Sequence, residues 1–256
     1  TGVGGADPYT NVLRFVAAYN GFIAHHADRV MRVSTVAHLE RVNASGKLGI
    51  LIGIQNADHF RTVDDIPFFL GLGQRVGQLT YNTRNRIGTG AMDRSDGGLS
   101  DFGVDVVRRM NEVGMAVDVS HCGDRTTLDA MEVSTRPVLI THSNVRALVP
   151  GYPRNKTDEA IRAMARTGGV FGLTSVRSFI RDSEPTTMEH LLDHYDYVAR
   201  LVGVEHVGVG ADVDLHGYDA LPAEARATLG GRYAAQYRFR ERIDLEGQDH
   251  PLRMYD

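Results

Sequence analysis

The sequence has only one cysteine, Cys122, and no apolar run long enough to cross a bilayer. A single cysteine excludes an internal disulfide framework, and we expect Cys122 to be a small buried residue rather than a metal ligand. The longest apolar runs, such as KLGILIGI, fall far short of the ~20 residues that a membrane helix needs. We therefore expect a cytoplasmic protein with no membrane-spanning segment.

Several sequence motifs with known chemistry are also missing. The formal net charge of −4 gives no basic surface for nucleic acid, so a nucleic-acid partner is not expected. No Gly-x-Gly-x-x-Gly fingerprint follows the first predicted strand, and no Walker sequence occurs. The absence of a Gly-x-Ser-x-Gly elbow leaves a serine hydrolase poorly supported.

Short apolar runs alternate with helical patterns along most of the chain. Helices are predicted from Asp101 to Gly114, Arg125 to Val133, Thr157 to Arg166 and Met188 to Val202. Six predicted strands cover residues 48–55, 75–82, 116–121, 137–143, 169–176 and 206–214. This alternation favours parallel pairing in an α/β fold, either a barrel or an open doubly wound sheet. The 42% hydrophobic content can fill the core of one barrel domain spanning residues 1–256.

Polar residues stand at the carboxyl ends of these predicted strands. They are Gln55, Asn82, His121, His142 and Asp212. A TIM-type barrel builds its active site at these strand ends, whereas residues without a function would be scattered over both ends. The runs AVDVSH and PVLITHS each finish on a histidine, so two imidazoles from adjacent strands could bind one metal ion.

The first part of the chain, from Asn11 to about Asn43, has apolar residues at helical spacing. It contains His26-Ala27-Asp28, which matches the HxD pair of many metal-dependent hydrolases. That pair normally ends a strand, whereas here it falls in or just after a helix. We interpret it as an ordinary exposed pair. The chain from Leu221 onward is charged and helical in composition without a clear apolar stripe.

An ordered set of motifs resembles the renal or membrane dipeptidase family of zinc metallopeptidases, peptidase family M19. The motifs are VVRRMNEVGMAVDVSHCGDRTTLDAM, RPVLITHSNVRAL, PRNKTDEAI, TGGVFGL and EHVGVGADVDL, and the resemblance runs from about Gly46 to Leu215. The resemblance implies a distorted (β/α)8 TIM-type barrel with two zinc ions bridged by a carboxylate. It also implies hydrolysis of a dipeptide, often with a D-residue on the C-terminal side, and in some members opening of β-lactam rings.

The resemblance also implies roles for individual residues. His121 and His142 match the histidines that hold one zinc, and Asp212 matches the aspartate that takes a proton from the attacking water. Arg154 matches the arginine that meets the substrate's terminal carboxylate; its alternative is a solvated surface arginine. Tyr81 and Asn82 are expected to face the substrate.

Three departures from the family pattern make this an atypical member. Gln55 stands where the family has the glutamate that bridges both metals, and a neutral amide cannot offset two dications, so it is a doubtful ligand. Tyr81 stands where the family has a histidine that stabilises the tetrahedral intermediate; tyrosine cannot carry a positive charge near neutral pH. The family's HxD pair is not at its expected place, and we expect its strand to precede Thr1.

The sequence leaves two main hypotheses open. The first is a hydrolase with one or two zinc ions, in which metal-activated water attacks the amide bond of a dipeptide or a related compound. The alternative is a catalytically impaired barrel that binds a small carboxylate-bearing ligand, because both Gln55 and Tyr81 depart from the family. A structural protein without an occupied site is a weaker third reading, and a homodimer remains open.

Overall fold

A computed structural model describes residues 7–212 of the chain, which form two compact units. The first unit comprises the chain up to Ile140 together with Ala163–Gly169, and the second comprises Thr141–Arg162 and the chain from Val170 on. Each unit is described by itself. A single barrel domain spanning residues 1–256 stays a prediction.

Parallel strands form the centre of the first unit. β1 (Val30–Arg32) pairs with β2 (Leu48–Ile50), and separately β3 (Ile52–Ile54), β4 (Gln74–Gln78), β5 (Ala116–Asp118) and the start of β6 (Val138–Ser143) pair in that order. The prediction of a single strand over residues 48–55 is therefore wrong. This segment forms two strands, β2 and β3, which belong to different sheets and are separated by the half-exposed Leu51.

Two helices flank β1, where the sequence had predicted helix alone. α1 (Pro8–His25) begins after Asp7, whose Oδ1 accepts a hydrogen bond from the Thr10 N–H at 3.0 Å, and α2 (Val36–Ser45) follows β1. β1 was missed because three residues are too few to interrupt a helical pattern. Asp28 lies between α1 and β1 on the surface, paired with Arg29, so the interpretation of His26-Ala27-Asp28 as an exposed pair is confirmed for its aspartate.

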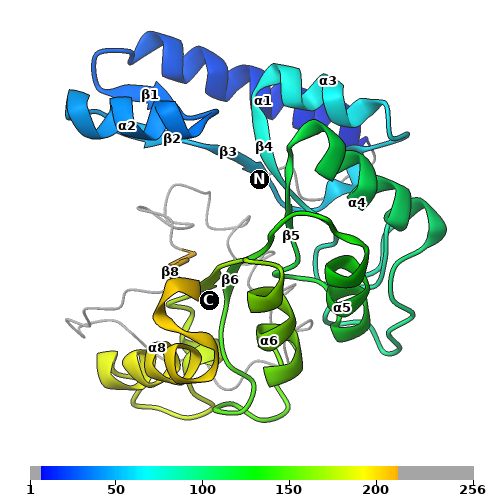
Figure 1. Cartoon of the computed structure of the whole chain (residues 1–256), viewed down its shortest axis with the longest axis vertical. Helices are drawn as coiled ribbons and strands as arrows, with labels where there is room; N and C mark the ends of the chain where they lie inside the picture. The colour runs from blue at the N-terminus through cyan, green and yellow to red at the C-terminus, as the bar shows by residue number, and fades with distance from the viewer. Residues whose placement is uncertain (1–6, 213–256) are drawn as a thin grey trace, which may run out of the picture. The chain divides into compact units, whose positions relative to one another are not determined.

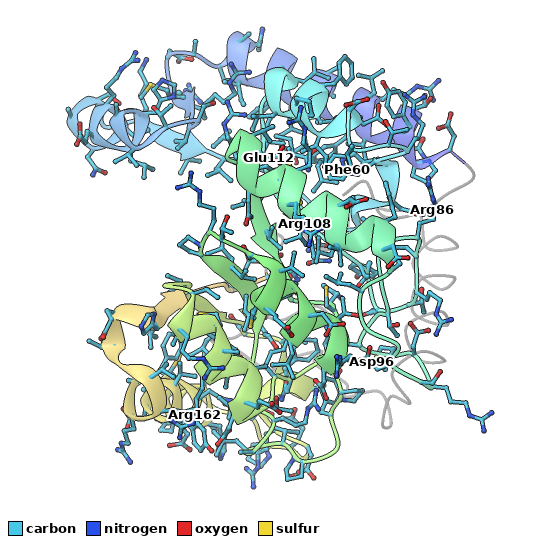
Figure 2. The ribbon with its side chains drawn as sticks, turned by 45° about the vertical axis from the view of Figure 1, so that its right-hand side comes forward. Phe60, Arg86, Asp96, Arg108, Glu112 and Arg162 are labelled. Carbon is cyan, nitrogen blue, oxygen red and sulfur yellow. The ribbon has the colours of Figure 1, made fainter. Side chains whose placement is uncertain are left out.

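The helices α3 (Asp65–Leu72), α4 (Asp101–Val113) and α5 (Asp124–Val133) follow one another along this unit (Figure 1). α4 is amphipathic: Val106, Val107 and Met110 are fully buried, whereas Arg108 and Glu112 lie on its solvent side (Figure 2). Burying each such apolar side chain stabilises the fold by roughly 1.5–3 kcal/mol. The Ser100 side chain caps the start of α4, and Gly114 ends it in the left-handed region with φ of 80°.

The second unit contains the end of β6, β7 (Phe171–Leu173) and β8 (Val207–Val209). β7 and β8 are parallel, with Gly172 opposite Gly208. α8 (Met188–Val202) packs on β7 and β8, and the short helix α7 (Arg177–Ile180) follows β7. Gly210 has to be glycine, because a Cβ there would lie 1.9 Å from the carbonyl oxygen of Thr141.

Most predicted helices agree with the structure to within about a residue at each end. The range 188–202 is α8, and 157–166 corresponds to α6 (Asp158–Arg166), which the division between the units crosses. The sequence missed α7 and the 3-10 turns Ala57–His59 and Val204–His206, since single turns carry no periodicity. The helical pattern predicted from Leu221 onward lies outside the described residues. No helix within residues 7–212 is both long enough and apolar enough to span a membrane.

Candidate functional site

Three predicted site residues meet at the strand ends of the first unit. The His121 ring stacks on Tyr81 with centroids 4.0 Å apart, and its Nδ1 lies 2.7 Å from Oδ1 of Asn82. Asn82 is fully buried and His121 is nearly so. An amide oxygen can only accept, so Nδ1 of His121 is the donor in this hydrogen bond. Oxygen acceptors orient metal-binding histidines in the same way.

The loop between β4 and α4 fixes Asn82 in place. Asn82 has a left-handed φ of 55°, and its carbonyl oxygen accepts a hydrogen bond from Met92 N–H at 2.7 Å. The adjacent Ala91 N–H donates to the carbonyl oxygen of His121 at 2.8 Å. Gly90 makes this possible, because a Cβ there would lie 2.2 Å from the Asn82 carbonyl carbon. The loop thus holds both the ligand candidate and its orienting amide.

Gln55 directly follows β3 and is partly buried. Its neighbour Asn56 has φ of 65° and accepts a hydrogen bond from Nδ2 of Asn85 at 2.8 Å. Within the described residues, the non-glycine residues with positive φ are Asn56, Asn82 and Asp212, and each lies just beyond a parallel strand. Strained backbone of this kind clusters at functional sites, although asparagine and aspartate tolerate it best.

In the second unit, His142 and Arg154 lie together. Nη2 of Arg154 donates to the carbonyl oxygen of His142 at 2.9 Å, and Nδ1 of His142 lies 2.8 Å from Oγ1 of Thr141. Arg154 is fully buried, so its reading as a solvated surface arginine is wrong. Its role toward a substrate carboxylate stays a prediction.

Asp212 is the last described residue and is exposed, with φ of 55°. The residue before it, Ala211, is held by β7's end: its carbonyl oxygen accepts from Ser175 N–H and from Thr174 Oγ1, both at 3.1 Å. Asp212 is thereby attached to a fixed strand end while its carboxylate faces solvent. Its role as a base stays a prediction.

Two further buried histidines, His59 and His194, were not singled out from the sequence. Burial lowers the pKa of His59 to about 4, although its hydrogen bonds to Gln74 and Asn56 oppose that shift. Burial also lowers the pKa of His194, whose Nδ1 accepts from Val145 N–H and whose Nε2 donates to the carbonyl oxygen of Ile180. Each ring has protein partners at both nitrogens, which is typical of a structural histidine. Cys122 is also buried, as predicted.

The described residues supply only part of a zinc centre. In residues 7–212, no group of three or more histidine, cysteine, aspartate or glutamate side chains is placed to hold a metal. A catalytic zinc usually has three protein ligands. His121 and His142 have the right donor chemistry, but Gln55 adds an amide instead of a carboxylate.

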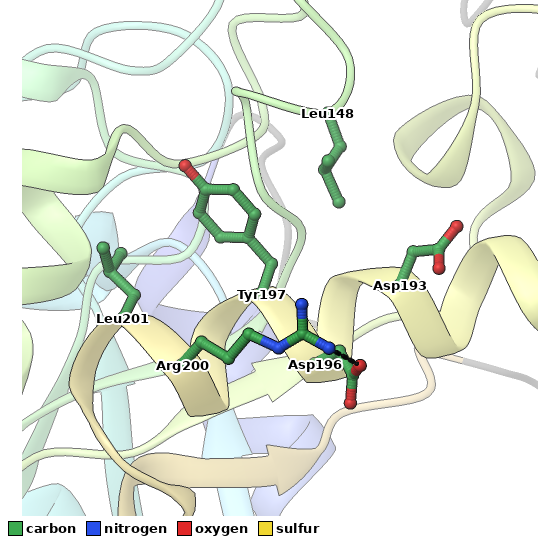
Figure 3. A pocket seen from close by; sticks show the side chains of 6 residues that line it. All are labelled: Leu148, Asp193, Asp196, Tyr197, Arg200 and Leu201. Atoms are coloured by element: carbon green, nitrogen blue, oxygen red, sulfur yellow. Dashed lines mark hydrogen bonds and ion pairs between the residues drawn. The ribbon is translucent and has the colours of Figure 1, made fainter.

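A pocket of about 500 Å³ lies elsewhere in the second unit, over α8 (Figure 3). It is lined by Leu148, Asp193, Asp196, Tyr197, Arg200 and Leu201. Arg200 and Asp196, one turn apart on α8, form an exposed ion pair at 2.7 Å. None of the predicted site residues lines this pocket, so we do not treat it as the active site.

Comparison with known proteins identifies the family. Residues 5–226 match the profile of membrane dipeptidase (peptidase family M19), and the chain belongs to that family. The chain is 33% identical over 195 residues to dipeptidase verJ of Clonostachys rogersoniana, covering 75% of this chain and 50% of the relative. The chain thus spans half the length of that dipeptidase.

Solved structures agree on the fold. An amidohydrolase from Pseudomonas aeruginosa matches with a TM-score of 0.78 and 35% identity, over 82% of this chain and 65% of the other. A metallo peptidase from Rhodobacter sphaeroides, liganded with a phosphinate mimic of the dipeptide L-Ala-D-Ala, matches with a TM-score of 0.74 and 22% identity. The latter covers 96% of this chain and 70% of that one. The predicted fold class, an α/β fold of the TIM-type barrel of this family, is confirmed.

Proposed function

We propose that the protein is a metal-dependent hydrolase that cleaves the amide bond of a dipeptide or a related small substrate. The observation that carries the proposal is the pairing of His121 with Asn82 at the carboxyl ends of β4 and β5. Asn82 holds the His121 ring through Nδ1, and Nε2 is the proposed ligand atom.

The chain's own residues divide the work as follows. His121 and His142 act as metal ligands, with zinc as the proposed ion and Gln55 as a doubtful third donor. Asp212 accepts the proton of the attacking water, because it is a solvent-facing carboxylate on a fixed backbone. Arg154 supports binding of the substrate's terminal carboxylate. Tyr81 and Asn82 border the substrate.

The remaining parts of the proposal concern the setting of the reaction. We propose a cytoplasmic location, supported by the single cysteine, and a single barrel domain spanning residues 1–256. One or two zinc ions and a homodimer are both compatible with the proposal. The proposed substrate class follows the family, in which two relatives of this chain, verJ and tcpJ, are named dipeptidases.

One experiment tests this function directly. Protein purified without chelator is analysed for bound metal and assayed on a panel of small dipeptides, L-Ala-D-Ala included, with and without added zinc. We expect bound metal and zinc-dependent turnover. Absence of both, even with zinc added, would exclude the hydrolase.

The Gln55→Glu variant tests the bridging position. A carboxylate can bridge two cations and offset part of their charge, so we expect more bound metal per chain than in the unaltered protein. Gln55→Ala is the matched control and should bind no additional metal. Equal metal content in Gln55→Glu and the unaltered protein would place Gln55 away from the bridge.

The second candidate is a binding protein without turnover. It is favoured by Tyr81, which stacks on His121. By the family resemblance, the position of Tyr81 is that of a catalytic histidine. Calorimetric binding of a dipeptide without hydrolysis would select it over the hydrolase.

A further inference from the structure

Arg177 is a buried cation at the carboxyl end of β7, and the family resemblance assigned it no role. It begins α7, and only 4% of its side chain is exposed. Glu184 clamps one edge of the guanidinium: Nε of Arg177 donates to Oε1 at 2.9 Å, and Nη2 donates to Oε2. The N–H and hydroxyl of Thr186 also donate to Glu184, which holds the carboxylate in position.

Among residues 7–212, the clamp leaves one end of the guanidinium without a hydrogen-bond partner. Nη1 of Arg177 is buried and has no hydrogen-bond partner within the part of the chain that the structure describes. A buried donor left without an acceptor costs roughly 1–3 kcal/mol, so native proteins rarely keep one without a reason. Because the clamp fixes Nε and Nη2, the planar guanidinium cannot rotate to bring Nη1 to another acceptor.

The segment that carries Arg177 joins two proposed site residues within the second unit. Upstream, Thr174 and Ser175 bind the carbonyl oxygen of Ala211, the residue next to Asp212. Downstream, the carbonyl oxygen of Phe179 accepts from Nδ2 of Asn155 at 2.8 Å.

The same downstream turn contacts Arg154 itself. The Arg154 guanidinium lies 5.2 Å from the centre of the Phe179 ring. Arg177 is therefore placed between the proposed base and the proposed carboxylate-binding arginine along this segment.

We propose that Nη1 of Arg177 donates a hydrogen bond to a neutral carbonyl oxygen of the substrate, such as a side-chain amide, and so sets substrate preference. Glu184 already neutralises the guanidinium, and a neutral acceptor suits a neutralised donor better than a second carboxylate does. This assignment rests on the proposed function, because it presumes a peptide-like substrate at these strand ends. It adds Arg177 as a specificity-determining residue, in addition to the proposed role of Arg154.

The test compares dipeptides in which Ala is joined, in either order, to Gln, Glu or Met. These three side chains have similar lengths and offer a neutral acceptor, a charged acceptor and no oxygen acceptor, respectively. Binding to the purified protein is measured by calorimetry, and turnover is measured separately. We expect the Gln dipeptide to bind about 10-fold more tightly than the Met dipeptide, as one hydrogen bond to an otherwise unpaired donor would give. Equal affinities, or no binding of either, would overturn this inference, whereas binding without turnover would overturn only the proposed hydrolase.

Two variants sharpen the test. Arg177→Lys keeps the positive charge opposite Glu184 but removes the guanidinium, and with it the Nη1 donor. The ratio of the affinities for the Gln and Met dipeptides should therefore fall to near unity. Glu184→Gln removes the neutralising charge and should shift preference from the Gln toward the Glu dipeptide. Arg200→Lys, the same change in an exposed ion pair, is the matched control and should leave both preferences unaltered. If Arg177→Lys fails to fold, an unchanged Glu-to-Gln preference in Glu184→Gln still contradicts the proposal.

Discussion

The strand ends of the two units differ in the kind of side chain they carry. In the first unit, the proposed site residues are Gln55, Tyr81, Asn82 and His121, and none of them is a carboxylate, a lysine or an arginine. In the second unit, the corresponding region carries the charged residues Arg154, Arg177 and Asp212 beside His142. Neutral amides and imidazoles orient and donate lone pairs, whereas charged groups bind carboxylates and move protons. Under the proposed function, the first unit carries a metal ligand with its orienting amide, and the second unit carries the charged residues proposed to act on the substrate.

Removing His121 or His142 should have the largest effect on activity. An unchanged activity would contradict the division of roles between the two units. We expect His121→Ala and His142→Ala each to lower zinc-dependent kcat/KM by at least about 100-fold, because loss of a metal ligand exceeds the 10–100-fold effects of its hydrogen-bond partners. His25→Ala, at an exposed position at the end of α1, is the control and should keep full activity. A His142→Ala enzyme with normal kinetics and normal metal content would refute the ligand assignment.

Removing the orienting amide should have a smaller effect in the first unit. Asn82→Gly keeps the left-handed backbone but deletes Oδ1, and we expect metal affinity to fall about 10–100-fold. Competition with a fluorescent chelator measures this affinity. Asn85→Ala, which removes an amide from the same loop but not from His121, is the comparison. Equal affinities in the unaltered protein and Asn82→Gly would show that His121 is not a ligand oriented in this way.

The buried histidine His59 predicts a pH dependence of stability in the first unit. Its folded-state pKa is about 4 and its ordinary value is 6.5, so the unfolded chain binds the proton more readily. The unfolding free energy is therefore at its full value above pH 6.5. It decreases as the pH falls toward 4, by on the order of 3 kcal/mol in all.

Chemical denaturation at pH 7 and pH 5 measures this dependence. The unaltered protein should lose more unfolding free energy than His59→Gln over this interval, since glutamine does not titrate. An exposed His25→Gln variant should behave like the unaltered protein. Parallel losses in His59→Gln and the unaltered protein would rule out His59 as the source.

The smallest effect is expected at the pocket over α8. Arg200→Ala removes an exposed ion pair, whose contribution is about 0–1 kcal/mol, and should leave dipeptide turnover unchanged. Thermal unfolding and the dipeptide assay measure both. A clear loss of turnover would move the active site toward this pocket and away from the strand ends.

The amino-acid pattern alone was enough to predict the parallel α/β class, most helices and the placement of polar residues at strand ends. The reason is that periodicity and strand-end polarity are local, and α4 and α8 illustrate this because their apolar spacing predicted both ends. Short elements such as β1 and α7 carried no such signal. The family resemblance supplied the candidate residues but not their surroundings.

Contacts between separate segments decided the rest. The stack of Tyr81 on His121, the Asn82 hydrogen bond and the clamp of Glu184 on Arg177 join residues by packing and backbone geometry that no local pattern encodes. Burial likewise separated Arg154 from an ordinary surface arginine and made His59 and His194 structural. Burial depends on what folds over a residue, and the residue's own neighbours in sequence do not determine it.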